Sequence, residues 1–253
     1  AWIGAPCLVF NSLINLDSSF SVVKNVIIAA ILMIVGMLLF SYIVLKILNL
    51  NFRTYVNPIT FVNSGNLGIT LCLFAFGNIG LEISIIYFAV VSIANFTLGV
   101  SIWSGEWSPK ILLKSPILFA AMAVIFFNVI NIPIPKMAMN TISLLSGATI
   151  PLLLFSMGIS IANIKFDISF KLIFLILLRT TFALFLAYSV TVILDLDGVS
   201  QKIILLQAVL PAALFNFLFS SEYSISPPEV ANYIMLSTII SILTISIFLF
   251  III

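Results

Sequence analysis

Charged side chains are scarce in this sequence, which carries only ten basic and eight acidic residues among 253. Charged residues make up 7% of the chain and hydrophobic residues 63%, whereas a soluble domain is about a quarter charged. So little charge could not cover a water-facing surface. The composition therefore excludes a soluble enzyme, a nucleic-acid-binding protein and a disordered chain, and it predicts an integral membrane protein.

Histidine is absent, and the two cysteines, Cys7 and Cys72, both lie in apolar stretches. Without imidazole there are no histidine proton relays and no histidine-ligated metal sites. Two cysteines in such positions supply no disulfide framework. We expect no metal and no other cofactor, and the chain offers no catalytic set of residues for an intramembrane enzyme.

Long apolar runs dominate the chain, whose mean hydropathy is +1.34. A spanning helix needs about 20 apolar residues, whereas a membrane β-barrel would alternate polarity in segments of about ten residues. The uninterrupted runs predict an all-α polytopic membrane protein. Nine spans are expected near residues 1–16, 23–48, 56–77, 80–103, 111–131, 139–162, 168–194, 200–219 and 229–253.

The loops between these spans differ in their content of basic residues. The side expected to be cytoplasmic by the positive-inside rule collects Lys46, Arg53, Lys110, Lys114, Lys165 and Lys171. The opposite side holds Lys24, Lys136 and Lys202. The C-terminus would then face outward from the cell (inner or plasma) membrane.

Short motifs recur in the same order at an offset of about 145 residues. The matching pairs are Pro6–Phe10 with Pro151–Phe155, Phe74–Phe76 with Phe217–Phe219, and Tyr87–Phe88 with Tyr233–Ile234. An odd number of spans separates the partners, so residues 1–105 and 106–253 are predicted to be inverted repeats, as in many secondary transporters. The span at 111–131 has no counterpart after this shift. We therefore expect a tenth helix before Ala1 and an N-terminally truncated ten-helix protein.

Polar and helix-breaking residues gather in one segment of each predicted repeat. Residues 61–70 are rich in glycine and asparagine, which weaken a helix and give freed backbone groups other partners. In the matching segment, Pro211 removes a backbone donor. Matched breaks of this kind indicate the substrate site of inverted-repeat carriers. The expected substrate-binding residues are Asn63, Ser64, Gly65, Asn66, Gly68, Thr70, Gln207, Pro211 and Asn216.

Electrostatics favours an anionic substrate at these breaks, because half-helix N-termini expose N–H groups with partial positive charge. The alternative is that the buried amides only join neighbouring helices. No carboxylate lies in the middle of an expected span, which argues against a coupling ion held by a buried acid but leaves sodium on carbonyl oxygens open. Arg179 is the one charge well inside a span. We expect it to snorkel to the cytoplasmic surface, with a substrate or gating role as the alternative.

Three segments resemble the auxin efflux carrier (PIN-like) family. Phe61–Leu71 with Phe76–Leu81 resembles its fourth helix, Ser146–Gly158 its seventh, and Pro211–Tyr223 with Leu236–Thr238 its ninth and tenth. This chain departs from the family pattern at Thr70, where a proline is usual. It also has Phe215 at the usual asparagine position, with Asn216 one place later.

The resemblance implies a bacterial-type, elevator-like carrier for organic anions such as malate, malonate or, in plants, auxin. It also implies that the first two helices of each repeat form a scaffold and the last three a moving transport domain. Two other hypotheses stay open: a sodium-coupled organic-anion symporter on a related fold, and a non-transporting membrane sensor. The expected partners are a small organic anion and the lipid bilayer, with a homodimer as an open oligomeric state and no nucleic acid.

Overall fold

The computed structural model describes residues 3–14, 20–106, 116–130, 133–162 and 167–252, and within these ranges the chain is helical with no strand. The predicted all-α class is thus confirmed. Lys110, Lys114 and Lys165, which entered the orientation argument, lie outside these ranges. The helices are α1 (Gly4–Ile14), α2 (Phe20–Ile47), α3 (Phe52–Thr60), the π-helical segment η1 (Ser64–Ile69), α4 (Thr70–Ala94), the π-helical segment η2 (Asn95–Gly99), α5 (Val100–Ser104), α6 (Pro116–Ile130), α7 (Lys136–Ala162), α8 (Phe170–Ile193), α9 (Gly198–Ala208), α10 (Phe215–Glu222) and α11 (Pro227–Ile252).

Every apolar run identified in the sequence contains helix. Within the described residues, four helical stretches are long and apolar enough to cross a membrane: Ser21–Ile47, Ser64–Ser104, Phe170–Ile193 and Pro227–Ile252. Two of the expected spans, 56–77 and 200–219, are interrupted, because a short gap separates α3 from η1 and another separates α9 from α10. The helices α3, α9 and α10 are each too short to span a bilayer of about 30 Å alone.

The 41-residue stretch Ser64–Ser104 folds back on itself at Gly77. This glycine has φ 64° and ψ −149°, a backbone conformation that residues with a side chain rarely adopt. A Cβ atom added at Gly80 would lie 2.2 Å from the carbonyl oxygen of Cys72. In a straight helix, residues eight apart are separated by about 12 Å. The stretch is therefore a helical hairpin, which agrees with the separate spans expected at 56–77 and 80–103.

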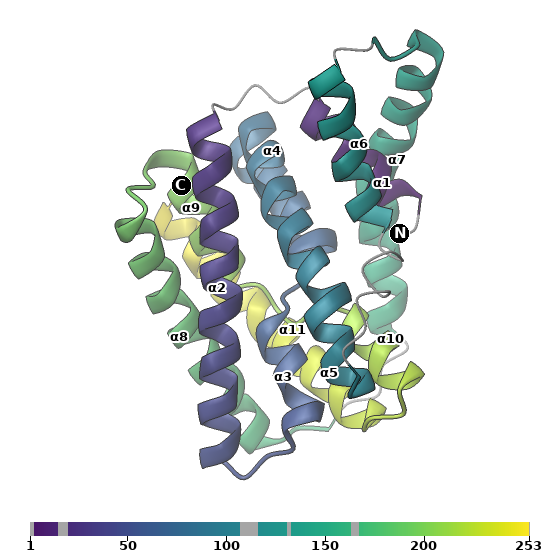
Figure 1. Ribbon diagram of the computed structural model, residues 1–253. Coiled ribbons are helices and arrows are strands. Elements are labelled where there is room, and N and C mark those ends of the chain that lie inside the picture. Colours follow the sequence, from purple (N-terminus) through teal and green to yellow (C-terminus); the bar gives the residue numbers. More distant parts are fainter. Residues whose placement is uncertain (1–2, 15–19, 107–115, 131–132, 163–166, 253) are drawn as a thin grey trace.

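The buried apolar side chains form two cores. The larger core, which contains Val26, Ile59 and Leu206, joins α2, α3, α4, α8, α9 and α11. The smaller core, which contains Val9 and Val124, joins α1 and α6 to η1 and α4, with residues of α7 packed against it. In Figure 1, α1, α6 and α7 stand together on one side, α2 and α8 stand on the other, and α4 lies between them. Both halves of the sequence contribute helices to each core.

Candidate functional site

The gap between α3 and η1 and the gap between α9 and α10 cross each other at the centre of the larger core. The backbone N–H of Asn63 donates to the carbonyl oxygen of Pro211 at 2.8 Å, and that of Ala213 donates to the carbonyl of Phe61 at 3.0 Å. These bonds form an isolated antiparallel bridge. The backbone groups of each gap lack partners within a helix, and the other gap supplies the hydrogen bonds instead. Buried backbone groups need such partners.

Local sequence explains where each helix stops. α3 contains Pro58 in its last turn, and Pro211 stands in the second gap. Each proline lacks the N–H that a continuing helix would use. The second gap is also anchored to α11, because the hydroxyl of Ser237 accepts from the backbone N–H of Ala212 at 3.2 Å. Ser237 is not among the site residues predicted from the sequence, although it lies in the Leu236–Thr238 segment of the family resemblance.

Asn216 ties the start of α10 to the crossing. Its side chain is fully buried, and Nδ2 donates to the carbonyl oxygen of Phe61 at 3.2 Å. Its Oδ1 has no hydrogen-bond partner among the described residues. A buried acceptor without a donor costs free energy, so Asn216 carries an unused acceptor next to the first gap. Asn63 and Ser64, at the start of η1, are also buried.

Gly68 and Gln207, predicted from different halves of the sequence, meet in the structure. A Cβ at Gly68 would lie 2.8 Å from Oε1 of Gln207 and 2.8 Å from Cδ1 of Leu210. Gln207 is fully buried and its Nε2 donates to the Cys72 sulfur at 3.8 Å. Only glycine leaves room for this close approach between η1 and α9.

The remaining predicted site residues are held within η1 and α4 rather than at the contact between the gaps. The hydroxyl of Thr70 donates to the carbonyl oxygen of Asn66 at 2.9 Å, which is a common use of threonine inside a helix. Asn66 itself is partly exposed. Gly65 faces the ring of Phe88, 2.6 Å from where its Cβ would be. Gly65 therefore serves close helix packing.

Arg179 does not snorkel to the surface, and that expectation was wrong. It lies in α8 and is only 5% exposed. Its Nε donates to the carbonyl of Ile59 at 3.2 Å, and its Nη1 donates to the carbonyls of Ala208 at 2.8 Å and Leu210 at 3.0 Å. The carbonyl oxygens at the ends of α3 and α9 accept these hydrogen bonds, so the buried guanidinium does not need to reach the membrane surface. Two features of the sequence pointed to this role: a lone charge deep in an apolar run, and two predicted helix breaks whose carbonyls need donors.

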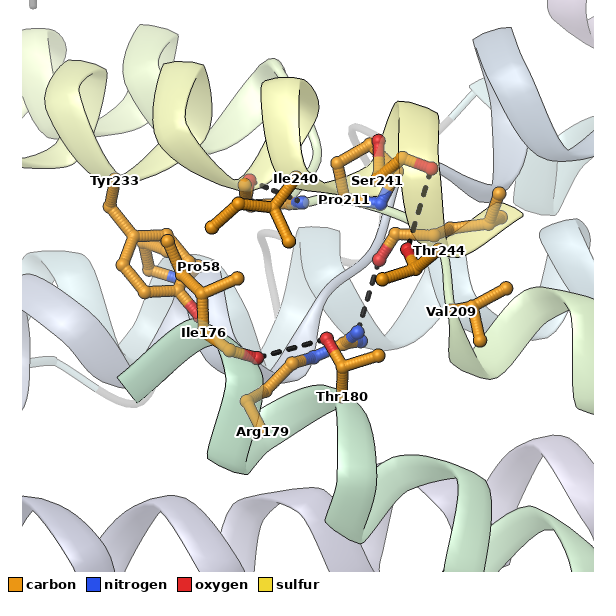
Figure 2. Close-up of a pocket in the computed structure, with 13 residues that line it drawn as sticks. Pro58, Ile176, Arg179, Thr180, Val209, Pro211, Tyr233, Ile240, Ser241 and Thr244 are labelled. Carbon is orange, nitrogen blue, oxygen red and sulfur yellow. Dashed lines mark hydrogen bonds between the residues drawn. The ribbon is translucent and has the colours of Figure 1, made fainter. Parts of the chain in front are cut away.

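Two small pockets adjoin the crossing, and Arg179 borders both. One has a volume of about 10 Å³ and includes Thr180, Pro211, Ser241 and Thr244 in its lining. Figure 2 shows Arg179 and Thr180 facing the extended segment that carries Pro211. The other also has a volume of about 10 Å³ and is lined by α2 and α4 side chains together with Thr60 and Gln207. Each therefore has room for about one water molecule, far below the volume of about 300–1,000 Å³ that typical ligand pockets hold.

These features define a polytopic helical membrane protein in which two interrupted helices cross and share backbone hydrogen bonds. The chain belongs to the family described as membrane transport protein, whose pattern matches residues 104–249. This agrees with the resemblance to auxin efflux carriers, and the family is one of transport proteins. The chain is therefore a multi-pass membrane protein of a transport family.

Two curated relatives support the same assignment. The chain is 26% identical over 195 residues to an uncharacterized transporter of Methanocaldococcus jannaschii, a match that covers 73% of this chain and 63% of the relative. It is 27% identical over 255 residues to an uncharacterized transporter of Methanothermobacter thermautotrophicus, covering 96% of this chain and 83% of the relative. The chain thus spans less than two thirds of the first relative and most of the second.

Proposed function

We propose that this protein is a secondary-active carrier of small organic anions across the cell membrane, with its substrate site where the two interrupted helices cross. The observation that carries the proposal is the backbone pairing of Asn63 with Pro211 and of Phe61 with Ala213. Carriers of the inverted-repeat class bind substrate at interrupted helices near the membrane centre. The predicted repeats at residues 1–105 and 106–253 would each supply one of the two breaks.

The charge pattern favours an anion. The second halves of both interrupted helices, η1 with α4 and α10, begin directly after the crossing at Ser64 and Phe215. Each N-terminus carries about half an elementary positive charge. Together, two such helix ends would offset the charge of one carboxylate. Asn63 and Asn216 lie at the starts of these two helices. Malate-like and malonate-like carboxylates are the substrate class that we propose.

An elevator movement is the proposed mechanism, and the two cores support it. The larger core contains both interrupted helices, so the crossing would travel with α2, α3, η1, α4, α5, α8, α9, α10 and α11 as one body. The helices α1, α6 and α7 would be the scaffold, and they pack against the other body chiefly through η1 and α4. Ile69, Ile85 and Phe88 supply apolar contact at that boundary. Apolar side chains carry no directional bonds that sliding would have to break.

Counterflow in proteoliposomes tests this function. Vesicles loaded with unlabelled malate, malonate or an indole carboxylate would be diluted into the same labelled compound. For at least one compound, we expect the label to accumulate transiently inside vesicles that were loaded with unlabelled compound, and not inside empty vesicles. Equal labelling of loaded and empty vesicles for all three, by protein shown to be folded, would contradict the proposed substrate class. Repeating the assay with and without sodium and a pH gradient identifies a coupling ion.

A further inference from the structure

Arg179 binds the ends of both interrupted helices at once. Its three hydrogen bonds reach the carbonyl oxygens of Ile59, Ala208 and Leu210 at 3.2, 2.8 and 3.0 Å. Ile59 lies at the end of α3, Ala208 ends α9, and Leu210 follows it. All three partners are backbone carbonyls, so the guanidinium charge is offset by helix ends rather than by a carboxylate.

The charges at this place balance. Each helix C-terminus carries about half an elementary negative charge, so the ends of α3 and α9 together offset about one positive charge. Arg179 supplies one, because a guanidinium stays protonated in proteins. Without it, three carbonyls would lose a donor inside an apolar core, which is a costly arrangement.

In carriers with interrupted helices, half-helix C-terminal ends and unwound carbonyls are where coupling cations bind. In this chain those same groups are already bound to a side chain. Hydroxyl groups line the adjoining pockets, from Thr60 in one and from Thr180, Ser241 and Thr244 in the other. Carbonyl and hydroxyl oxygens are the ligands that hard cations accept. The carbonyl and hydroxyl oxygens around the ends of α3 and α9 could therefore ligate a cation, and the guanidinium of Arg179 occupies that position.

We infer that Arg179 is a fixed internal cation that replaces an exchangeable coupling ion, so that the carrier works without sodium. The consequence for transport rests on the proposed function, whereas the consequence for cation binding does not. Removal of the side chain should leave a cavity with free carbonyl and hydroxyl oxygens. That cavity should take up sodium or free guanidinium.

The first experiment measures the apparent Tm of purified protein in detergent, in sodium chloride and in choline chloride of equal ionic strength. The wild type should give the same Tm in both salts. Arg179→Ala should melt lower in choline, and sodium or about 10 mM guanidinium, far below denaturing concentrations, should raise its Tm again. Lys171→Ala, an exposed cation in the same helix, is the matched control and should match the wild type.

Arg179→Lys covers the case in which the alanine variant does not fold. Lysine keeps the positive charge but lacks the planar fork, so this variant should melt below the wild type and should not respond to sodium. A wild type or Arg179→Lys protein that sodium stabilises would overturn the inference. An Arg179→Ala protein as stable in choline as the wild type would overturn it as well.

Counterflow then tests the transport consequence. Wild-type exchange should be equal in sodium and choline. Exchange by Arg179→Ala should fall at least about tenfold in choline, because the ends of both interrupted helices lose their shared donor, and should recover in part with sodium or guanidinium. Wild-type exchange that needs sodium overturns the inference. Absence of wild-type exchange with every carboxylate contradicts the proposed function, and the Tm measurements still decide the cation question.

Discussion

The helical hairpin at Gly77 predicts that Gly80→Ala will be unusually harmful for a substitution that adds one methyl group. The added Cβ would lie 2.2 Å from the carbonyl oxygen of Cys72 and 2.7 Å from Cβ of Phe76. The first obstacle is backbone in the opposite arm, so no side-chain rotation relieves it. The two arms must separate by about 1 Å, because real Cβ atoms are essentially never found within 3.0 Å of another heavy atom.

Overpacking of this kind costs about 1–3 kcal/mol. For chains of about 150–250 residues, each kcal/mol lowers Tm by about 2–4 °C, so Gly80→Ala should lower the apparent Tm by about 2–12 °C. Separation of the arms also displaces η1 from α9, so counterflow should fall by more than the loss of folded protein explains. The assay is thermal unfolding in detergent, followed by counterflow normalised to folded protein.

Gly147→Ala is the matched control for this substitution. Gly147 lies in α7, and a Cβ there would meet no atom within 4 Å. Because alanine favours a helix over glycine by about 0.5–1 kcal/mol, this variant should be as stable as the wild type or slightly more so. If Gly80→Ala melts at the same temperature as Gly147→Ala, the close contact between the arms of the hairpin is refuted.

Four further substitutions test other parts of the structure. Gly77→Ala should cost about 1–3 kcal/mol through its positive φ alone, because no atom lies near its Cβ position; an unchanged Tm would contradict the turn. Asn63→Ala and Asn216→Ala should each lower counterflow about tenfold, which corresponds to about 1.4 kcal/mol, while membrane insertion stays intact; unchanged transport in both would refute the site assignment. Tyr55→Phe removes the hydroxyl that donates to Glu229 at 2.8 Å and should lower stability by about 1 kcal/mol, an effect that Glu229→Ala should abolish in a double-mutant cycle.

Composition and patterning were enough to predict the class and the position of the helices. Apolar runs long enough to span a bilayer force helix formation, since backbone groups must be satisfied without water. Glycine, asparagine and proline favour helix breaks through their local conformational preferences, so breaks could be predicted within residues 61–70 and around Pro211. Gly68 and Gln207, each predicted at one of these breaks, meet in the structure.

The environment of Arg179 could not be predicted, because it depends on three chain segments that are far apart in sequence. From the sequence, Arg179 was only a charge inside an apolar run, and the side chain of such an arginine commonly extends to the membrane surface. Its actual partners are carbonyls that become available only when α3 and α9 end side by side. The partial exposure of Asn66 and the use of the Thr70 hydroxyl within its own helix likewise depend on packing.

By itself the sequence determined the membrane environment, the helical class, the places where helices stop and the family, because these follow from local composition and periodicity. Only the tertiary structure decided that the two breaks pair through backbone hydrogen bonds, that Gly80 lies against the backbone of Cys72, and that Arg179 binds the ends of both interrupted helices. Those features depend on which unsatisfied backbone groups come within about 3 Å of each other. That distance is set by the packing of the whole chain.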